Sequence, residues 1–141
     1  NSYDFILLSR VIHGWMRVEG LLDRHFANLA GSLKPGGVLA IEQHRENPGP
    51  QDPMAESGYV TEAFVIEAAE RTGLRLAARS EINANPKDTK DHPFGVWTLP
   101  PTRITVPYGS GKAPDPNFDR SKYDAIGEYD RMTLRFVKAI P

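Results

Sequence analysis

The sequence predicts an α/β fold that begins with a parallel βαβ unit, and three consecutive segments lead to this prediction. Residues 3–9 contain the uninterrupted apolar run FILL, which is typical of a buried β-strand. Residues 18–33 carry apolar side chains at spacings of three and four, which place them on one face of a helix. Residues 38–44 begin with a second apolar run. Two strands joined by one helical crossover pair in parallel, and the crossover is right-handed.

Length and composition limit the possible function classes. The chain has 141 residues, of which 40% are hydrophobic and 25% charged, and this fits one globular domain over residues 1–141. Its 17 basic and 18 acidic side chains give a net charge of −1, so we expect no nucleic-acid partner. The absence of cysteine excludes disulfides and thiolate chemistry, and no apolar run suggests a membrane span.

The first strand carries a further expectation. A continuous apolar run, unlike an alternating one, is typical of a strand that is buried on both faces inside a parallel sheet. Such a strand needs neighbours on both sides. We therefore expect these residues to be the C-terminal part of a larger domain.

The rest of the chain divides at its glycines and prolines. The turn at residues 34–37 ends the first helix, and a loop covers residues 45–59. Residues 83–120 are rich in turn residues and form a long insertion between two strands. The remaining predicted elements are a helix at 61–72, a strand at 74–82, a short extended piece at 96–99, a short helix at 121–126 and a last strand at 130–139.

The order of these segments resembles the second half of a class I S-adenosylmethionine-dependent methyltransferase. The order is a strand, a loop that contains a histidine, a helix, the motif Leu33-Lys34-Pro35-Gly36-Gly37-Val38-Leu39, and a strand. The resemblance implies the C-terminal half of a Rossmann-like methyltransferase sheet. In that family the parallel strands are followed by a closing pair, one strand of which is antiparallel. Residues 74–82 and 130–139 correspond to this pair, so the long segment between them is an insertion.

Later motifs resemble a family of predicted bacterial methyltransferases, and this resemblance covers nearly the whole chain. It implies S-adenosylmethionine as the cofactor and, because that cofactor is made there, a cytoplasmic location by default. The resemblance carries over no particular substrate, and we expect a small-molecule acceptor. The motifs are ESGYV at 56–60, SEINANPKDTKD at 80–91, VWTLPP at 96–101, and IGE with DRMTL between 126 and 134.

The sequence departs from the methyltransferase pattern in one large respect. Residues 1–141 lack the glycine-rich turn that holds the methionine part of the cofactor, and also the acidic residue that holds its ribose. Both belong upstream of the first strand in this class. We therefore expect the 141 residues alone to be inactive.

Three residues near the first strand are candidates for the site. His13 follows this strand, where ligands of open α/β sheets bind, and an imidazole there can accept a proton from a substrate. The alternative is a histidine that packs beside Trp15 and bonds a backbone carbonyl. By resemblance, Ser9 and Arg10 line the methionine end of the cofactor. The alternative for Arg10 is a surface ion pair.

Glu42 and His44 lie two residues apart, and therefore on one face, at the end of the second strand. They can form an acid–base pair or bind a hard metal ion. We favour substrate contact because the chain has no His-Glu-x-x-His pattern, and we predict no metal. The alternative is a hydrogen-bonded pair that shapes the next loop.

Trp15, Arg45 and Tyr59 complete the predicted substrate site. Arg45 can pair with a substrate carboxylate, and its alternative is a solvated charge. Tyr59 has the alternative of a loop anchor. Two other functions remain open from the sequence: a non-catalytic module that binds a small molecule or a partner, and another nucleotide enzyme such as a nicotinamide dehydrogenase.

Overall fold

The computed structural model describes residues 1–141 and contains a single sheet. It has four strands in the order β1-β2-β4-β3. β1 is parallel to β2, whereas β4 runs antiparallel to both of its neighbours. The α/β fold class is thereby confirmed, with a parallel βαβ unit followed by an antiparallel closing pair. The strands are β1 (Tyr3–Ser9), β2 (Leu33–His44), β3 (Leu74–Ser80) and β4 (Arg131–Lys138).

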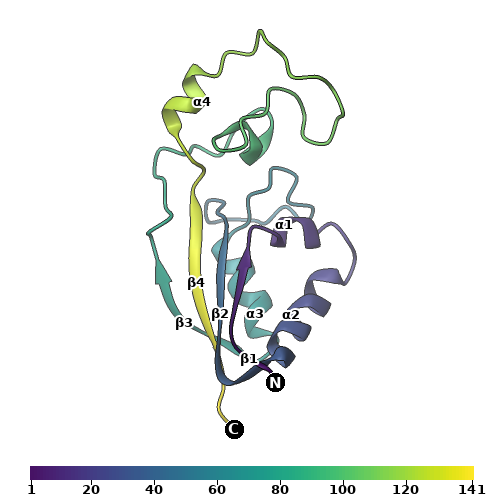
Figure 1. Ribbon diagram of the computed structural model, residues 1–141, viewed down its shortest axis with the longest axis vertical. Helices are drawn as coiled ribbons and strands as arrows, with labels where there is room; N and C mark the ends of the chain where they lie inside the picture. Colours follow the sequence, from purple (N-terminus) through teal and green to yellow (C-terminus); the bar gives the residue numbers. More distant parts are fainter.

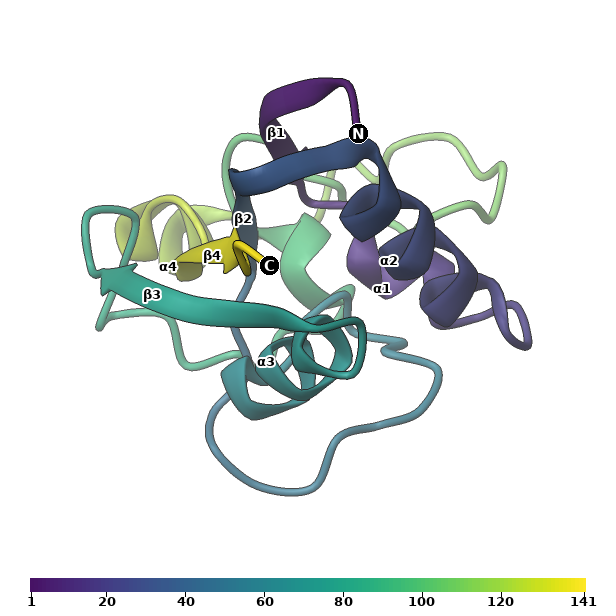
Figure 2. The same cartoon turned by 90° about the horizontal axis from the view of Figure 1, so that it is seen from below.

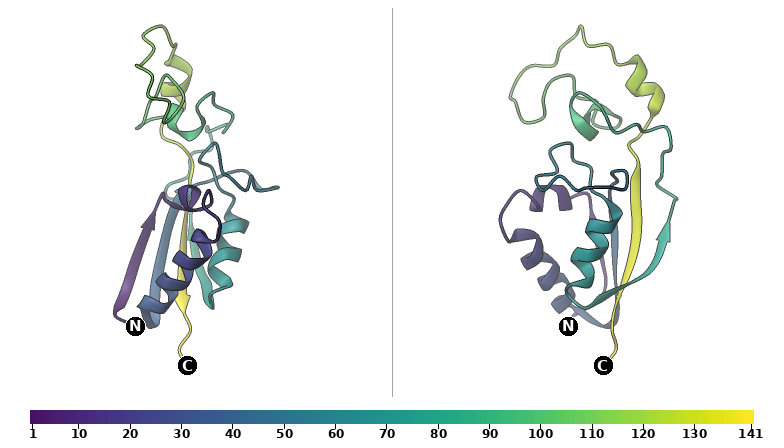
Figure 3. Two further views of the ribbon diagram at one scale, coloured as in Figure 1. Left: turned by 90° about the vertical axis from the view of Figure 1, so that its right-hand side faces the viewer. Right: turned by 180° about the vertical axis from the view of Figure 1, so that it is seen from behind.

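The two long helices cover the same face of this sheet (Figures 1 and 3). α2 connects β1 to β2, and α3 connects β2 to β3. Both crossovers advance in the same direction across the sheet, so their common right-handedness places both helices on one side. The helices are α1 (Ile12–Trp15), α2 (Leu21–Ser32), α3 (Glu62–Glu70), the 3₁₀ turn η1 (Gly95–Thr98) and α4 (Ser121–Ile126).

The main core lies between this helical layer and the sheet. Leu39 and Ile41 of β2 and Phe136 of β4 point toward the helices and are fully buried. They meet Phe26 of α2 and Val65 of α3, which are also fully buried. Alternate residues of β2 are therefore in the core, and the residues between them lie on the other face.

The other face of the sheet is open. Tyr3, Phe5 and Leu7 of β1 are 57%, 58% and 63% exposed. Burial on both faces is expected of this strand only where a larger domain supplies its neighbours, so an exposed strand within these 141 residues does not contradict that expectation. The strand is exposed because α2 and α3 both cover the opposite face, and β1 is an edge strand (Figure 2).

The segment Lys34–Gly37, predicted as a turn before the strand, is the irregular beginning of β2. Tyr3 pairs with Leu33 but Phe5 pairs with Val38, so β2 accommodates extra residues between these two pairs. Gly36 has a φ of +77°, a conformation that other residues adopt only at a cost. A glycine therefore suits this position better than a residue with a side chain.

Residues 81–130, between β3 and β4, form a cap over the end of the sheet at which β1 and β2 finish (Figure 1). Both chain termini lie at the opposite end. The cap has a small core of its own, which includes Val96 and Leu99 together with Tyr59 from the preceding loop. Residues 96–99 do not form the predicted extended piece, because the chain turns at Gly95 (φ +62°) into η1.

The cap touches the 45–59 loop backbone to backbone. The Val96 amide donates to the Ser57 carbonyl at 2.9 Å. Gly58 has a φ of +81°, and a Cβ there would lie 2.6 Å from Val96 Cγ1. A Cβ on Gly95 would lie 2.5 Å from the Ser57 carbonyl oxygen. The two glycines therefore permit an approach that larger residues would prevent. Elsewhere, no helix has the length and apolar character needed to cross a membrane.

Candidate functional site

The carboxyl ends of β1 and β2 meet the start of β4 beneath the cap, and Ser9, Arg10 and Glu42 come together there. Ser9 Oγ donates to Glu42 Oε2 at 2.5 Å. The Arg131 guanidinium lies 2.8 Å from the other carboxylate oxygen. Arg10 Nη1 donates to the Tyr129 hydroxyl at 2.8 Å. The structure thus groups the two predicted cofactor residues with one predicted catalytic residue.

Arg10 has an unusual backbone conformation at this position. Its φ is +54°, which costs roughly 1–3 kcal/mol for a residue with a side chain. Its amide donates to the Glu42 carbonyl at 2.8 Å, and this bond helps to hold the turn. A cavity of about 520 Å³ opens beside Arg10 and is also lined by Leu7, Glu42 and Arg131. A strained residue at a cavity is a common feature of functional sites.

His13 and His44 form a second group at the same edge, with ring centres 5.0 Å apart. His44 Nδ1 donates to the Gly58 carbonyl at 3.0 Å, and the His44 ring packs edge-on against Tyr129. No hydrogen bond joins His44 to Glu42, because Glu42 is taken up by Ser9 and Arg131. The two predicted members of an acid–base pair therefore have separate partners.

Both imidazoles in this group are held in the neutral form. Burial, together with the nearby His13, lowers the pKa of His44 to about 3. Burial and the charge of Arg17 also lower the pKa of His13. At neutral pH His44 is therefore suited to holding a hydrogen bond and poorly suited to holding a proton.

Gln43 connects the two histidines, and sequence reasoning missed it. Its side chain is fully buried, and its Oε1 accepts from the Ile12 amide at 3.1 Å. Its Nε2 lies 3.1 Å from His13 Nδ1 and 3.4 Å from the Gly58 carbonyl. A polar residue at a core-facing strand position was the available signal, because a buried amide requires partners. We call His13, Gln43, His44 and the Gly58 carbonyl the Gln43 cluster.

Aromatic residues from distant segments surround this cluster. The Trp97 ring of the cap packs edge-on against His13, with centres 5.9 Å apart. On its other side Trp97 stacks on Tyr108 at 4.4 Å and lines a cavity of about 440 Å³. No short-range pattern in the sequence brings Trp97 or Tyr129 to His13 and His44.

Two of the predicted substrate residues are engaged in packing. Trp15 lies against His25 of α2, with ring centres 4.4 Å apart, and against Phe26. His13 therefore packs beside Trp97 and not beside Trp15. Tyr59 is 1% exposed, and its hydroxyl donates to Asp88 at 2.8 Å. Tyr59 is thus a loop anchor, the alternative considered for it above.

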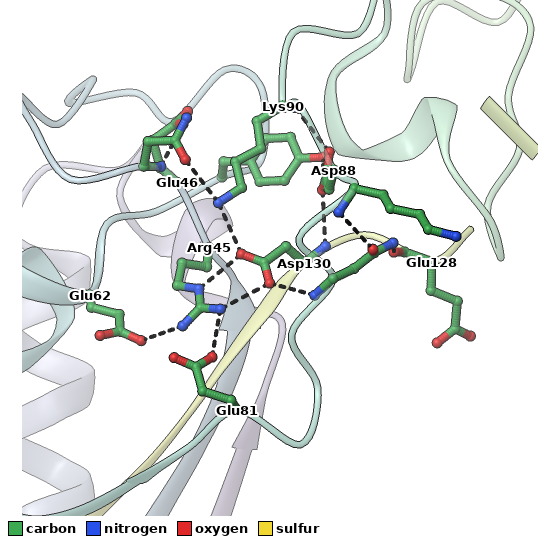
Figure 4. Close-up of polar contacts among 12 residues, drawn as sticks. Arg45, Glu46, Glu62, Glu81, Asp88, Lys90, Glu128 and Asp130 are labelled. Atoms are coloured by element: carbon green, nitrogen blue, oxygen red, sulfur yellow. Dashed lines mark hydrogen bonds and ion pairs between the residues drawn. The ribbon is translucent and has the colours of Figure 1, made fainter. Parts of the chain in front are cut away.

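Arg45, the third predicted substrate residue, is held by acidic side chains (Figure 4). Its guanidinium donates to Asp130 at 2.9 and 3.0 Å, to Glu62 at 2.9 Å and to Glu81 at 2.8 Å. The ammonium of Lys90 lies 2.9 Å from Asp130 on the other side. Arg45 is therefore neither a solvated charge nor free to bind a substrate carboxylate. We call these five side chains the Asp130 cluster.

Electrostatics and hydrogen bonds make this cluster the attachment of the cap. Burial alone would raise the pKa of Asp130, but hydrogen bonds from Arg45 and Lys90 outweigh it and lower the pKa to about 2. Asp88, which is also buried, accepts from the Asp130 amide at 2.9 Å and from His92 Nε2 at 2.8 Å. No three metal-binding side chains gather closely enough to hold an ion.

Comparison with known proteins identifies the fold to which this chain belongs. No protein-family model matches the sequence, and no curated protein matches it either. Solved structures do match. A chain of the complex between the Haloferax volcanii Trm112 methyltransferase activator and a putative methyltransferase aligns with 99% of this chain, at 14% identity and a TM-score of 0.54. The chain has part of a Rossmann-like methyltransferase fold.

Two further solved structures share this fold. The pyocyanin biosynthetic protein PhzM aligns with 99% of the chain at 13% identity and a TM-score of 0.52. The [4+2]-cyclase SpnF aligns with 100% of it at 13% identity and a TM-score of 0.54. The chain spans 55%, 31% and 51% of the lengths of the Haloferax protein, PhzM and SpnF, respectively. At such identities the likeness concerns the fold alone.

Proposed function

We propose that the protein transfers a methyl group from S-adenosylmethionine to a small-molecule acceptor, and that residues 1–141 are the C-terminal part of its catalytic domain. The observation that carries this proposal is the position of β4, which runs antiparallel between β2 and β3. This is the closing pair that the methyltransferase resemblance implies. A dinucleotide-binding dehydrogenase is instead built from two parallel mononucleotide-binding halves.

The residues at the carboxyl edge fit the amino-acid part of this cofactor. The cavity beside Arg10 is lined by two guanidinium groups, those of Arg10 and Arg131. Their positive charges complement the carboxylate group of the cofactor. When bound, the cofactor supplies an activated methyl group. Ser9 and Arg10 would hold its methionine end, and His13, Glu42 and His44 would position the acceptor and exclude water.

The experiment compares cofactor affinity with turnover in the complete protein. Calorimetric titration with S-adenosylmethionine should give saturable binding. Alanine at His13 or Glu42 should lower the rate of methyl transfer to a substrate while changing the cofactor Kd little. We expect the isolated 141-residue chain to bind the cofactor weakly and to lack activity, because its residues include neither the glycine-rich turn nor the ribose-binding carboxylate of this class. Tight binding by this chain would contradict the proposal that residues 1–141 supply only part of the cofactor site.

A second outcome would favour another function on the same fold. SpnF, whose fold is similar, is a [4+2]-cyclase. Cofactor binding without methyl transfer to any tested acceptor would therefore support a non-transferring role, such as a binding module. No cofactor binding by the complete protein would overturn the proposal.

A further inference from the structure

We propose that the cavity of about 440 Å³ between the cap and the rest of the chain binds an aromatic amino acid, with Arg17 taking its carboxylate, Glu56 its ammonium and Trp97 its ring. The assignment follows from the residues that line this cavity. It goes beyond the function proposed above and does not depend on it, so the experiments below test the two separately.

Three segments that are distant in the sequence form the walls of this cavity. Arg17 follows α1, Glu56 belongs to the 45–59 loop, and Trp97 and Tyr108 belong to the cap. Its volume is within the range of small-molecule sites, which is roughly 300–1,000 Å³. The cavity is therefore large enough for a ligand of the size of an amino acid.

The walls are held at a fixed distance by backbone contacts. Ser57 and Gly95 both line the cavity. The Ser57 carbonyl accepts from the Val96 amide at 2.9 Å, and Gly95 approaches the same carbonyl so closely that a Cβ there would lie 2.5 Å from its oxygen. The two walls thus keep their separation without a ligand, and a preformed cavity lowers the entropy cost of binding.

Arg17 supplies a positive charge in a fixed position. Its Nε donates to the Met54 carbonyl and its Nη2 to the Ala55 carbonyl, both at 3.0 Å. The guanidinium also lies over the Trp97 ring, 5.8 Å from the ring centre. Its Nη1 has no acceptor within the chain, and no carboxylate forms an ion pair with it, in contrast to Arg45. A ligand carboxylate matches such a guanidinium in charge and geometry.

Glu56 supplies a negative charge to the same cavity. The Asp52 carboxylate accepts from the Met54 and Glu56 amides, both at 3.0 Å, and these bonds fix the turn that carries Glu56. The Glu56 carboxylate itself has no hydrogen bond or ion pair within the chain. Arg17 and Glu56 thus line one cavity without pairing with each other. A ligand with both an ammonium and a carboxylate can pair with both, whereas a ligand with one charge is attracted by one and repelled by the other.

Aromatic side chains define the rest of the ligand. The Trp97 and Tyr108 rings stack with their centres 4.4 Å apart, and both residues line the cavity. Such walls favour a planar apolar body. An ammonium, a carboxylate and a planar ring together describe an aromatic amino acid.

The first experiment compares three ligands by calorimetric titration of the complete protein without cofactor. L-phenylalanine carries all three groups, 3-phenylpropionate lacks the ammonium, and 2-phenylethylamine lacks the carboxylate. L-phenylalanine should bind saturably, and each analogue should bind roughly tenfold more weakly, because one charge-assisted hydrogen bond is lost. Equal affinities for the three compounds, or no saturable binding of L-phenylalanine, would overturn the proposal.

The second experiment assigns the two charges by substitution. Glu56→Gln should remove the preference for L-phenylalanine over 3-phenylpropionate and keep the preference over 2-phenylethylamine, and Arg17→Met should do the reverse. Glu67→Gln on α3 is the control, because Glu67 is 75% exposed and does not line the cavity. The Glu56 side chain has no partner within the chain, so its substitution tests the proposal even if Arg17→Met weakens the loop. An unchanged preference in Glu56→Gln would contradict the assignment.

The third experiment locates the ligand by the indole N–H signals of tryptophan-labelled protein. The signal that is lost in Trp97→Phe should shift on titration with L-phenylalanine. The signal that is lost in Trp15→Phe should not, because Trp15 packs against α2. A shift of the Trp15 signal alone would place the ligand outside this cavity and refute the proposal. Failure of S-adenosylmethionine to bind the same sample would instead refute methyl transfer and leave the cavity's assignment unaffected.

Discussion

Two polar clusters lie side by side at the end of β2, the Gln43 cluster and the Asp130 cluster. They differ in how many of their polar groups have a hydrogen-bond or ion-pair partner within the chain. In the Asp130 cluster, which begins at Arg45, the guanidinium and the carboxylates bond to one another within the chain. In the Gln43 cluster, the groups are uncharged and two imidazole nitrogens have no partner in the chain. The first cluster is therefore a structural attachment, and the second is the better candidate for binding a ligand.

The cost of burying each kind of group explains this division. A buried charge without a partner lowers the stability of the fold by several kcal/mol. The Asp130 cluster is tolerated only because its charges are paired with one another. A neutral imidazole costs less free energy to bury, so one of its nitrogens can remain without a partner in the absence of a ligand. Charge in a site is thus not by itself a sign of function, as the contrast between Arg45 and His44 illustrates.

The largest expected effect is on the charged side of this comparison. Asp130→Asn leaves the shape unchanged but removes the charge that Arg45 and Lys90 share, and the carboxylate is only 5% exposed. We expect the free energy of unfolding, measured with urea, to fall by about 3–5 kcal/mol. Glu81→Gln is the control, because Glu81 is 72% exposed and its pair should be worth less than about 1 kcal/mol. Equal losses in the two variants would contradict the role given to Asp130.

The fold was predictable from the sequence because its signals are local. The apolar runs and the periodicity of 18–33 specify β1, α2 and β2, and Gly73 marks the end of the next helical segment. Which face of β1 is exposed was not predictable, because it depends on which face the helices cover. Nor was η1, which follows from the contact of Gly95 with Ser57.

The site was predictable only in part, and the reason is the distance between its members along the chain. His13, Glu42 and His44 were candidates because they lie at or just after the carboxyl ends of strands. Arg45 was misread because Asp130, its main partner, is 85 residues away. Trp97 and Tyr129 reach the histidines through the cap, which has no regular periodicity. Gln43 alone had a usable local signal, as a polar residue in a core-facing position.

The second prediction concerns the carbonyl that fixes the Gln43 cluster. Gly58→Ala places a Cβ within 2.6 Å of Val96 at a φ of +81°. We expect a loss of about 2–4 kcal/mol in unfolding free energy, from backbone strain and overpacking together. Gly109→Ala is the matched control, because its φ is +74° but its Cβ would meet open space. A similar loss in both variants would mean that φ alone, and not the contact with the cap, restricts Gly58.

The third prediction separates the clusters by their response to acid. His44 takes up a proton near pH 6.5 in the unfolded chain but only near pH 3 in the folded one, so stability falls as the pH drops through this window. The slope should approach about 1.4 kcal/mol per pH unit. The pKa of Asp130 is lowered to about 2, so its contribution is present above its usual pKa of 3.8 and is lost only at lower pH.

Urea titrations from pH 7 to pH 4 check this order. His44→Asn keeps a donor for the Gly58 carbonyl and removes the titrating ring, so it should flatten the pH dependence above pH 4. Asp130→Asn should leave the slope in that range almost unchanged. An equally steep slope in wild type and His44→Asn would show that His44 is not held neutral in the folded protein.

The smallest effect on stability is expected at Arg10, which resembles Arg45 in type but not in environment. Its side chain is 41% exposed, and its φ is +54°. Arg10→Gly loses the bond to Tyr129 but relieves the strained backbone, so the two changes nearly cancel, and we expect less than about 1 kcal/mol in unfolding free energy. If Arg10 lines the cofactor, the same variant of the complete protein should bind S-adenosylmethionine roughly tenfold more weakly, because a charge-assisted hydrogen bond is lost. Arg103→Ala, another exposed arginine but one paired within the cap to Asp124, is the control and should bind normally. At Arg10 we thus expect the cofactor affinity to change while the free energy of unfolding stays nearly the same. In the Asp130 cluster, where the charges are paired with one another, we expect a substitution to lower mainly the free energy of unfolding. A large loss of stability with unchanged cofactor affinity would place Arg10 among the structural charges with Arg45.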